Sequence, residues 1–81
     1  MTNLEKYDQA FKLNFKVSDD DLPGLVYQGI FEWDSVGHMD LMADFEAAYG
    51  IQMSTKDVLD FTSYEKGKKI LTERYGVNFD E

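Results

Sequence analysis

Residues 34–50, DSVGHMDLMADFEAAYG, decide the fold of this chain, because they form one amphipathic pattern with both helix ends marked. Asp34 or Ser35 supplies an N-cap, and Gly50 is a natural terminator, with Ile51 beyond it as an apolar contact. At about 100° per residue the apolar side chains gather on one side, which we expect to face the core. That side holds His38, Leu41, Met42, Phe45, Ala48 and Tyr49.

A second helix is predicted at the start of the chain. Thr2 and Glu5 have capping-box spacing, and apolar residues then recur on one helical face at Leu4, Tyr7, Phe11 and Phe15. This helix should end near Phe15 or Lys16. Residues 18–21, Ser-Asp-Asp-Asp, read as a turn or a short cap.

The connection over residues 17–34 is long and contains the only proline, Pro23. It is too apolar for a solvated linker, and a loop of this length in a small domain is usually functional or packed over the core. We expect it to lie across the helices, with Ile30 and Phe31 partly buried.

Two more helical segments follow. Ser54-Thr55 should cap a short turn through Val58 and Leu59, and the capping box Thr62-x-x-Glu65 should open a last helix from about Ser63 to Tyr75. Tyr64, Ile70, Leu71 and Tyr75 should face inward, and Gly67 inside this helix suggests close packing. The predicted fold class is therefore all-α. It is a small bundle of three main helices plus one short helix, with a long first loop, in a single domain over residues 1–81.

Composition limits the chemistry. The 81 residues suffice for one core, and the absence of cysteine excludes disulfides and thiolate metal sites. The N-terminus is polar and no long apolar run follows, so we expect neither a signal peptide nor a membrane span, and a cytoplasmic location.

The net charge of −8 is concentrated in the middle of the chain. No Lys or Arg lies between Lys16 and Lys56. This argues against nucleic acid and anionic membranes as partners and favours a basic protein surface, although acidity can also serve solubility alone. The eight acids of this segment are Asp19, Asp20, Asp21, Glu32, Asp34, Asp40, Asp44 and Glu46.

The outward side of the helix after Ser35 is unusual for a solvated face. Val36, Met39, Ala43 and Ala47 form an apolar strip, bordered by Asp40 and Asp44 on one side and Glu46 on the other. An apolar centre with a charged rim is typical of a docking surface. The alternative is that Val36 and Met39 pack beneath the long loop.

Ser35 has several possible roles. It could be a plain N-cap, or a nucleophile assisted by His38, which lies three residues later on the same helix. No oxyanion-hole motif or nucleophile elbow surrounds the pair, and His38 fits a half-buried core position better. The aspartate run lacks the alternating ligands of a calcium loop, so no metal site is predicted.

Two motifs mark the ends of the helix that follows the long connection: Asp34-Ser35-Val36 at its start and Tyr49-Gly50-Ile51 at its end. They are similar to the Asp-Ser-Leu motif and the aromatic-Gly-Ile helix ending of the acyl carrier protein family, which the chain resembles over roughly residues 30–72. Leu41, Phe45 and Glu46 fall on its second-helix pattern, and Phe61-Thr62, followed by Tyr64, on its step into the last helix.

The resemblance implies an acyl-carrier-protein-like fold and a covalent 4′-phosphopantetheine arm, transferred from coenzyme A to Ser35 with Asp34 beside it. Acyl or aminoacyl intermediates would be carried on that arm as thioesters, for fatty-acid, polyketide or related biosynthesis. The chain would be a carrier rather than an enzyme. Its partners would be a phosphopantetheinyl transferase and acyl-activating and synthase enzymes with basic docking surfaces, which would contact Val36, Met39, Asp40, Asp44 and Glu46. We expect a monomer.

The sequence departs from the commonest family pattern, Leu-Gly-x-Asp-Ser-Leu, in having Phe31-Glu32-Trp33 before Asp34. A Trp at this place is more similar to discrete carriers of specialised pathways. The alternative function is an unmodified helical adaptor that binds a basic partner.

Overall fold

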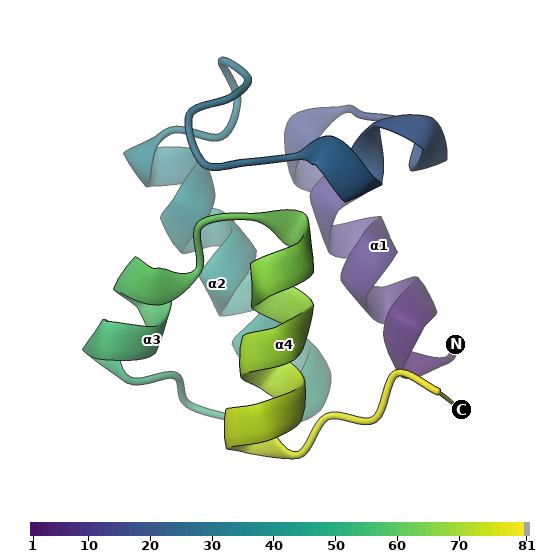
Figure 1. Cartoon of the computed structure of the whole chain (residues 1–81), viewed down its shortest axis with the longest axis vertical. Coiled ribbons are helices and arrows are strands. Elements are labelled where there is room, and N and C mark those ends of the chain that lie inside the picture. The colour runs from purple at the N-terminus through teal and green to yellow at the C-terminus, as the bar shows by residue number, and fades with distance from the viewer. Residues whose placement is uncertain (81) are drawn as a thin grey trace.

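Five helical segments make up the computed structural model, which describes residues 1–80 (Figure 1). The segments are α1 (Asn3–Phe15), the short 3-10 helix η1 (Asp19–Gly24), α2 (Ser35–Tyr49), α3 (Thr55–Asp60) and α4 (Tyr64–Tyr75). Within these residues the only β contact is an isolated antiparallel bridge between Val26 and Ser63. The prediction of an all-α bundle with three main helices and a short one is confirmed. The structure contains one further helical segment that was not predicted, η1, within the long connection.

The helix ends follow the capping chemistry of the sequence. Thr2 and Glu5 form the predicted capping box, and the Asp34 side chain caps α2. Gly50 ends α2 with a left-handed φ of 64°, which a residue without Cβ adopts readily. The predicted cap at Thr62 is wrong: Ser63 caps α4 by accepting the backbone N–H of Lys66 at 3.0 Å.

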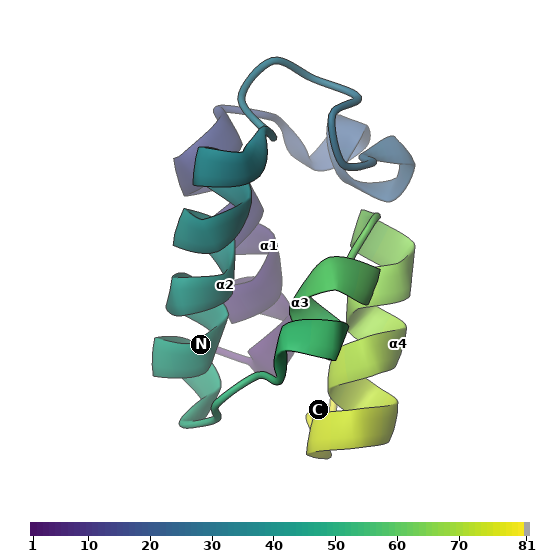
Figure 2. The same cartoon turned by 90° about the vertical axis from the view of Figure 1, so that its left-hand side faces the viewer.

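The connection between α1 and α2 crosses one end of the bundle (Figure 2). Its η1 segment packs against α4 and α1 and buries Leu22. Two backbone hydrogen bonds tie the following residues to the start of α4. The Tyr27 N–H donates to the Thr62 carbonyl at 2.9 Å, and the Tyr64 N–H donates to the Leu25 carbonyl at 3.0 Å. The connection is therefore part of the packed structure, as predicted.

Two apolar positions differ from their predicted burial. Ile30 is half-buried as predicted, but Phe31 is 92% exposed. The Trp33 N–H donates to the Ile30 carbonyl in a tight turn, so the turn directs Trp33 inward and Phe31 outward. Ala48 is exposed rather than in the core, because it lies at the edge of the apolar face of α2, beside an open groove toward α1.

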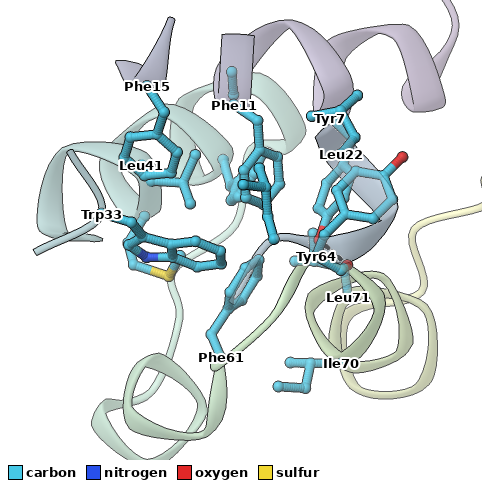
Figure 3. Packing of buried hydrophobic residues seen from close by; sticks show 14 of the residues in the cluster. Tyr7, Phe11, Phe15, Leu22, Trp33, Leu41, Phe61, Tyr64, Ile70 and Leu71 are labelled. Atoms are coloured by element: carbon cyan, nitrogen blue, oxygen red, sulfur yellow. Dashed lines mark hydrogen bonds between the residues drawn. The ribbon is translucent and has the colours of Figure 1, made fainter. Parts of the chain in front are cut away.

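Seven of the sixteen buried hydrophobic residues described are aromatic, and their rings pack together in the core (Figure 3). Tyr7 stacks on Phe45 with ring centroids 4.9 Å apart, and Phe45 stacks on Phe61 at 5.6 Å. Gly67 is needed where α4 meets this cluster, since a Cβ there would overlap the Phe61 ring and the Tyr7 hydroxyl. The close packing predicted from Gly67 is confirmed.

A buried carboxylate joins α3 to α4. Asp57 accepts hydrogen bonds from the Tyr75 hydroxyl at 2.6 Å and from the Arg74 guanidinium, with which it forms an ion pair. The Tyr75 hydroxyl, the Arg74 guanidinium and Ser54 hold the pKa of the Asp57 carboxyl below its usual range. The ionised Asp57 side chain therefore holds α3 against α4.

The opposite end of the bundle holds the start of α1 and the last residues that the structure describes. The Asn3 side chain donates to the Asn78 carbonyl at 3.0 Å, and the Tyr49 hydroxyl donates to the Asn3 carbonyl at 2.8 Å. The Phe79 ring lies 5.2 Å from Tyr7, centroid to centroid. The last residues described thus pack back onto the start of α1.

Candidate functional site

Ser35 is the first residue of α2 and is exposed. Asp34 precedes it in an extended conformation, and the Asp34 carboxylate accepts the Gly37 N–H at 2.8 Å. The Ser35 hydroxyl makes no hydrogen bond to any group in residues 1–80, so Asp34 performs the capping and leaves the hydroxyl free. The first N–H groups of a helix lack intrahelical partners, and a helix N-terminus favours anions.

Gly37 closes the turn that carries Ser35. A Cβ at this position would overlap the backbone carbonyl of Glu32 and would come within 3.2 Å of the Phe15 ring. The loop, the first turn of α2 and the end of α1 therefore meet with no room for a side chain. This close approach fixes where the Ser35 hydroxyl emerges from the surface.

His38 is buried and both of its ring nitrogens are engaged. The Trp33 indole N–H donates to Nδ1 at 2.9 Å, so Nε2 carries the ring proton and donates to the Val58 carbonyl at 2.8 Å. His38 therefore has no free lone pair to accept a proton from Ser35. The core role predicted for His38 fits this geometry, and His38 is not available as the base for a Ser35 nucleophile.

The outward side of α2 is exposed. Val36 is 69% and Met39 57% accessible to solvent, and Ala43 and Ala47 are exposed as well. The alternative in which Val36 and Met39 pack beneath the loop is wrong, because the loop passes over the end of the bundle rather than along this side (Figure 2). The predicted apolar strip thus lies on the surface, directly after Ser35.

The three acids beside this strip have different surroundings. Asp40 is exposed and has no hydrogen-bond partner within residues 1–80. Asp44 is exposed but accepts the Asn14 amide at 2.7 Å, which links α2 to α1. Glu46 is half-buried, and its carboxylate accepts the Met53 N–H at 2.8 Å. Asp40 and Asp44 therefore face solvent as predicted, while Glu46 is partly committed to holding the segment after α2.

A groove of about 360 Å³ lies between α2 and α3 along the strip. Its lining is apolar and rich in methionine, a side chain that adapts to varied shapes. The lining residues are Met39, Met42, Ala43, Glu46, Met53, Thr55, Val58 and Leu59. Leu59, on the α3 side, is 72% exposed. Met42 and Met53 of this lining are buried and belong to the core, which also contains the buried Leu41, Phe45, Phe61 and Leu71.

Trp33 is the site residue whose place the sequence patterns missed. It is fully buried against Phe11 and Phe15, with ring centroids 5.4 and 5.3 Å away. Trp33 lies in a loop, where no helical or strand period applies, so the pattern offers no signal of its orientation. Because it lies two residues before Ser35, the buried Trp33 side chain ties the backbone that leads into the site to the core.

Comparisons with models of known protein families, with curated proteins and with solved structures find no match. Within residues 1–80, no helix is both long and apolar enough to cross a membrane. The same residues contain no group of three or more His, Asp or Glu side chains arranged to hold a metal ion.

Proposed function

We propose that this chain is a carrier protein that receives a 4′-phosphopantetheine arm on Ser35. The observation that carries the proposal is a free, exposed serine hydroxyl at the first position of a 15-residue helix, next to an aspartate that already caps the helix. The resemblance of residues 30–72 to acyl carrier proteins identifies the group expected there. The protein would then be the substrate of a transferase and not a catalyst.

The local chemistry fits a phosphodiester at this hydroxyl. The helix N-terminus provides free N–H groups and the positive end of the α2 dipole, both of which favour an anion. Gly37 and Trp33 fix the turn from inside, so the hydroxyl is presented at a defined place. When bound, the arm supplies a terminal thiol that the cysteine-free chain lacks, on which acyl or aminoacyl groups are held as thioesters.

The surface beside Ser35 supports docking of basic enzymes. Val36 and Met39 supply exposed apolar area, and Asp40 and Asp44 supply exposed carboxylates. Such charges orient a basic partner and raise its association rate more than they raise affinity. The aromatic filling of the core leaves little room for a long cargo, so a short acyl or aminoacyl group is the cargo we favour.

The test is intact mass after incubation with coenzyme A and a broad-specificity phosphopantetheinyl transferase. We expect one phosphopantetheine to be added to the wild type and none to Ser35→Ala. Ser54→Ala is the matched control, because Ser54 is also an exposed serine at a helix start and should leave modification unchanged. Absence of a mass gain in the wild type, or a gain that persists in Ser35→Ala, contradicts the proposal.

The second candidate is an unmodified helical adaptor that binds a basic protein through the same strip. It is favoured by the apolar area of Val36 and Met39, which suits docking whether or not Ser35 is modified. The two candidates differ in the mass experiment. An adaptor would gain no mass and would bind its partner equally well as Ser35→Ala.

A further inference from the structure

Phe31 is exposed to a degree that nothing inside the bundle explains. Its side chain is 92% accessible, whereas Met1, the next most exposed large hydrophobic residue described, reaches 73%. The other phenylalanines are buried or half-buried. A solvated aromatic ring forgoes a large hydrophobic gain, and aromatic residues are the ones most often used as anchors in interfaces.

The loop that carries Phe31 is held firmly. The Gln28 N–H donates to the Trp33 carbonyl at 2.9 Å, and the Gly29 N–H donates to the Val26 carbonyl at 2.9 Å. Trp33 closes the turn from inside as a fully buried side chain. The backbone at Phe31 is thus fixed before any partner arrives, and a preorganised anchor loses little conformational entropy on binding.

The surroundings of Phe31 define the chemistry of a partner. Phe31 lies four residues before Ser35, next to the exposed carboxylates of Glu32 and Asp34. No Lys or Arg occurs between Lys16 and Lys56. A matching surface therefore needs an apolar pocket for the ring and Lys or Arg side chains around it. A second copy of this chain would bring like charges together, and an anionic membrane would be repelled.

We propose that Phe31 is the anchor by which the transferase that modifies Ser35 recognises this chain, inserting into an apolar pocket rimmed by Lys or Arg. This inference rests on the carrier function proposed above. Contact on the loop side of Ser35 would complement contact with Val36 and Met39 on the α2 side. The hydroxyl would then lie between two apolar contacts, which orient it toward the transferred phosphate.

The test compares initial rates of phosphopantetheine transfer from coenzyme A across a range of carrier concentrations. Phe31→Ala should lower kcat/KM about tenfold or more, chiefly through a higher KM, because a buried anchor is lost from the complex. Leu13→Ala is the matched control, since Leu13 is likewise exposed, at 72%, but belongs to α1 and to neither the Phe31 loop nor the α2 strip, and should stay within twofold. Equal urea midpoints for all three proteins will show that folding is unchanged.

The outcomes separate the two proposals. If the wild type is modified and Phe31→Ala is modified equally fast, the anchor is refuted while the carrier function stands. If the wild type gains no mass at all, both are refuted. A charge variant tests the basic rim: Glu32→Lys should slow transfer more at low than at high ionic strength. A loss that is independent of salt would overturn the assignment of a basic rim.

Discussion

Replacing His38 by Leu should destabilise the protein, because the Trp33 indole N–H and the Val58 carbonyl would each lose a hydrogen-bond partner. The Trp33 indole N–H is fully buried, and the Val58 carbonyl lies in a half-buried residue. Each orphaned polar group costs about 1–3 kcal/mol, with the Val58 carbonyl at the lower end because water can reach it. The added apolar area of Leu offsets part of this. We expect a net loss of about 2–3 kcal/mol in the free energy of unfolding.

Urea unfolding followed by circular dichroism measures this loss, with Met39→Leu as control. Met39 is the next residue on α2 and is exposed, so its substitution should change stability by less than about 0.5 kcal/mol. A double-mutant cycle with Trp33→Phe isolates the bond. In that background, His38→Leu should cost at least about 1 kcal/mol less. If His38→Leu lowers the free energy of unfolding no more than Met39→Leu does, the hydrogen bonds from Trp33 to His38 and from His38 to Val58 do not stabilise the fold as argued.

Three further variants test other features. Asp57→Asn should lower stability by about 1–3 kcal/mol at pH 7, since the bonds to Arg74 and Tyr75 lose their charge. Folding lowers the pKa of Asp57, so the ionised carboxylate stabilises the fold at pH values above its pKa in the unfolded chain, which is about 4. The difference in unfolding free energy between wild type and Asp57→Asn should therefore shrink as the pH falls below that value, as measured by urea unfolding at a series of acidic pH values. Gly67→Ala should lower the free energy of unfolding measured in urea by about 1–3 kcal/mol, because the new methyl group would overlap the packed Phe61 ring. This loss outweighs the better helix propensity of Ala, and a variant more stable than the wild type would contradict it. Asp40→Lys should slow modification of Ser35 at low salt and leave the urea midpoint unchanged, and equal rates would show that this carboxylate steers no partner.

The helices were predictable because their end signals and periods are local. Thr2, Asp34 and Gly50 act through bonds to residues within one or two turns, and the structure places them as the pattern predicts. The misplaced cap, Thr62 instead of Ser63, shows the limit of such signals. Thr62 contributes its carbonyl to Tyr27, a contact set by the distant connection and absent from any local pattern.

The environment of the candidate site was predictable only in part. Exposure of Val36 and Met39 follows from helical geometry once the buried face of α2 is known. The exposure of Phe31 and the burial of Trp33 depend on a turn in the loop, where the sequence has no repeating apolar period. The engagement of His38 by Trp33 and Val58 joins three separate elements, so it emerges only when the chain is folded.

The start of α1 and the last described residues pack together at the pole of the bundle opposite Ser35, which has a practical consequence. Asn3 and Asn78 are joined by a hydrogen bond at one pole, while α2 starts at the other (Figure 1). A fluorophore, a solid support or a fused domain attached near Asn3 or Asn78 would therefore project away from Ser35. A fusion at either place would likewise leave the pole that carries Ser35 exposed to solvent.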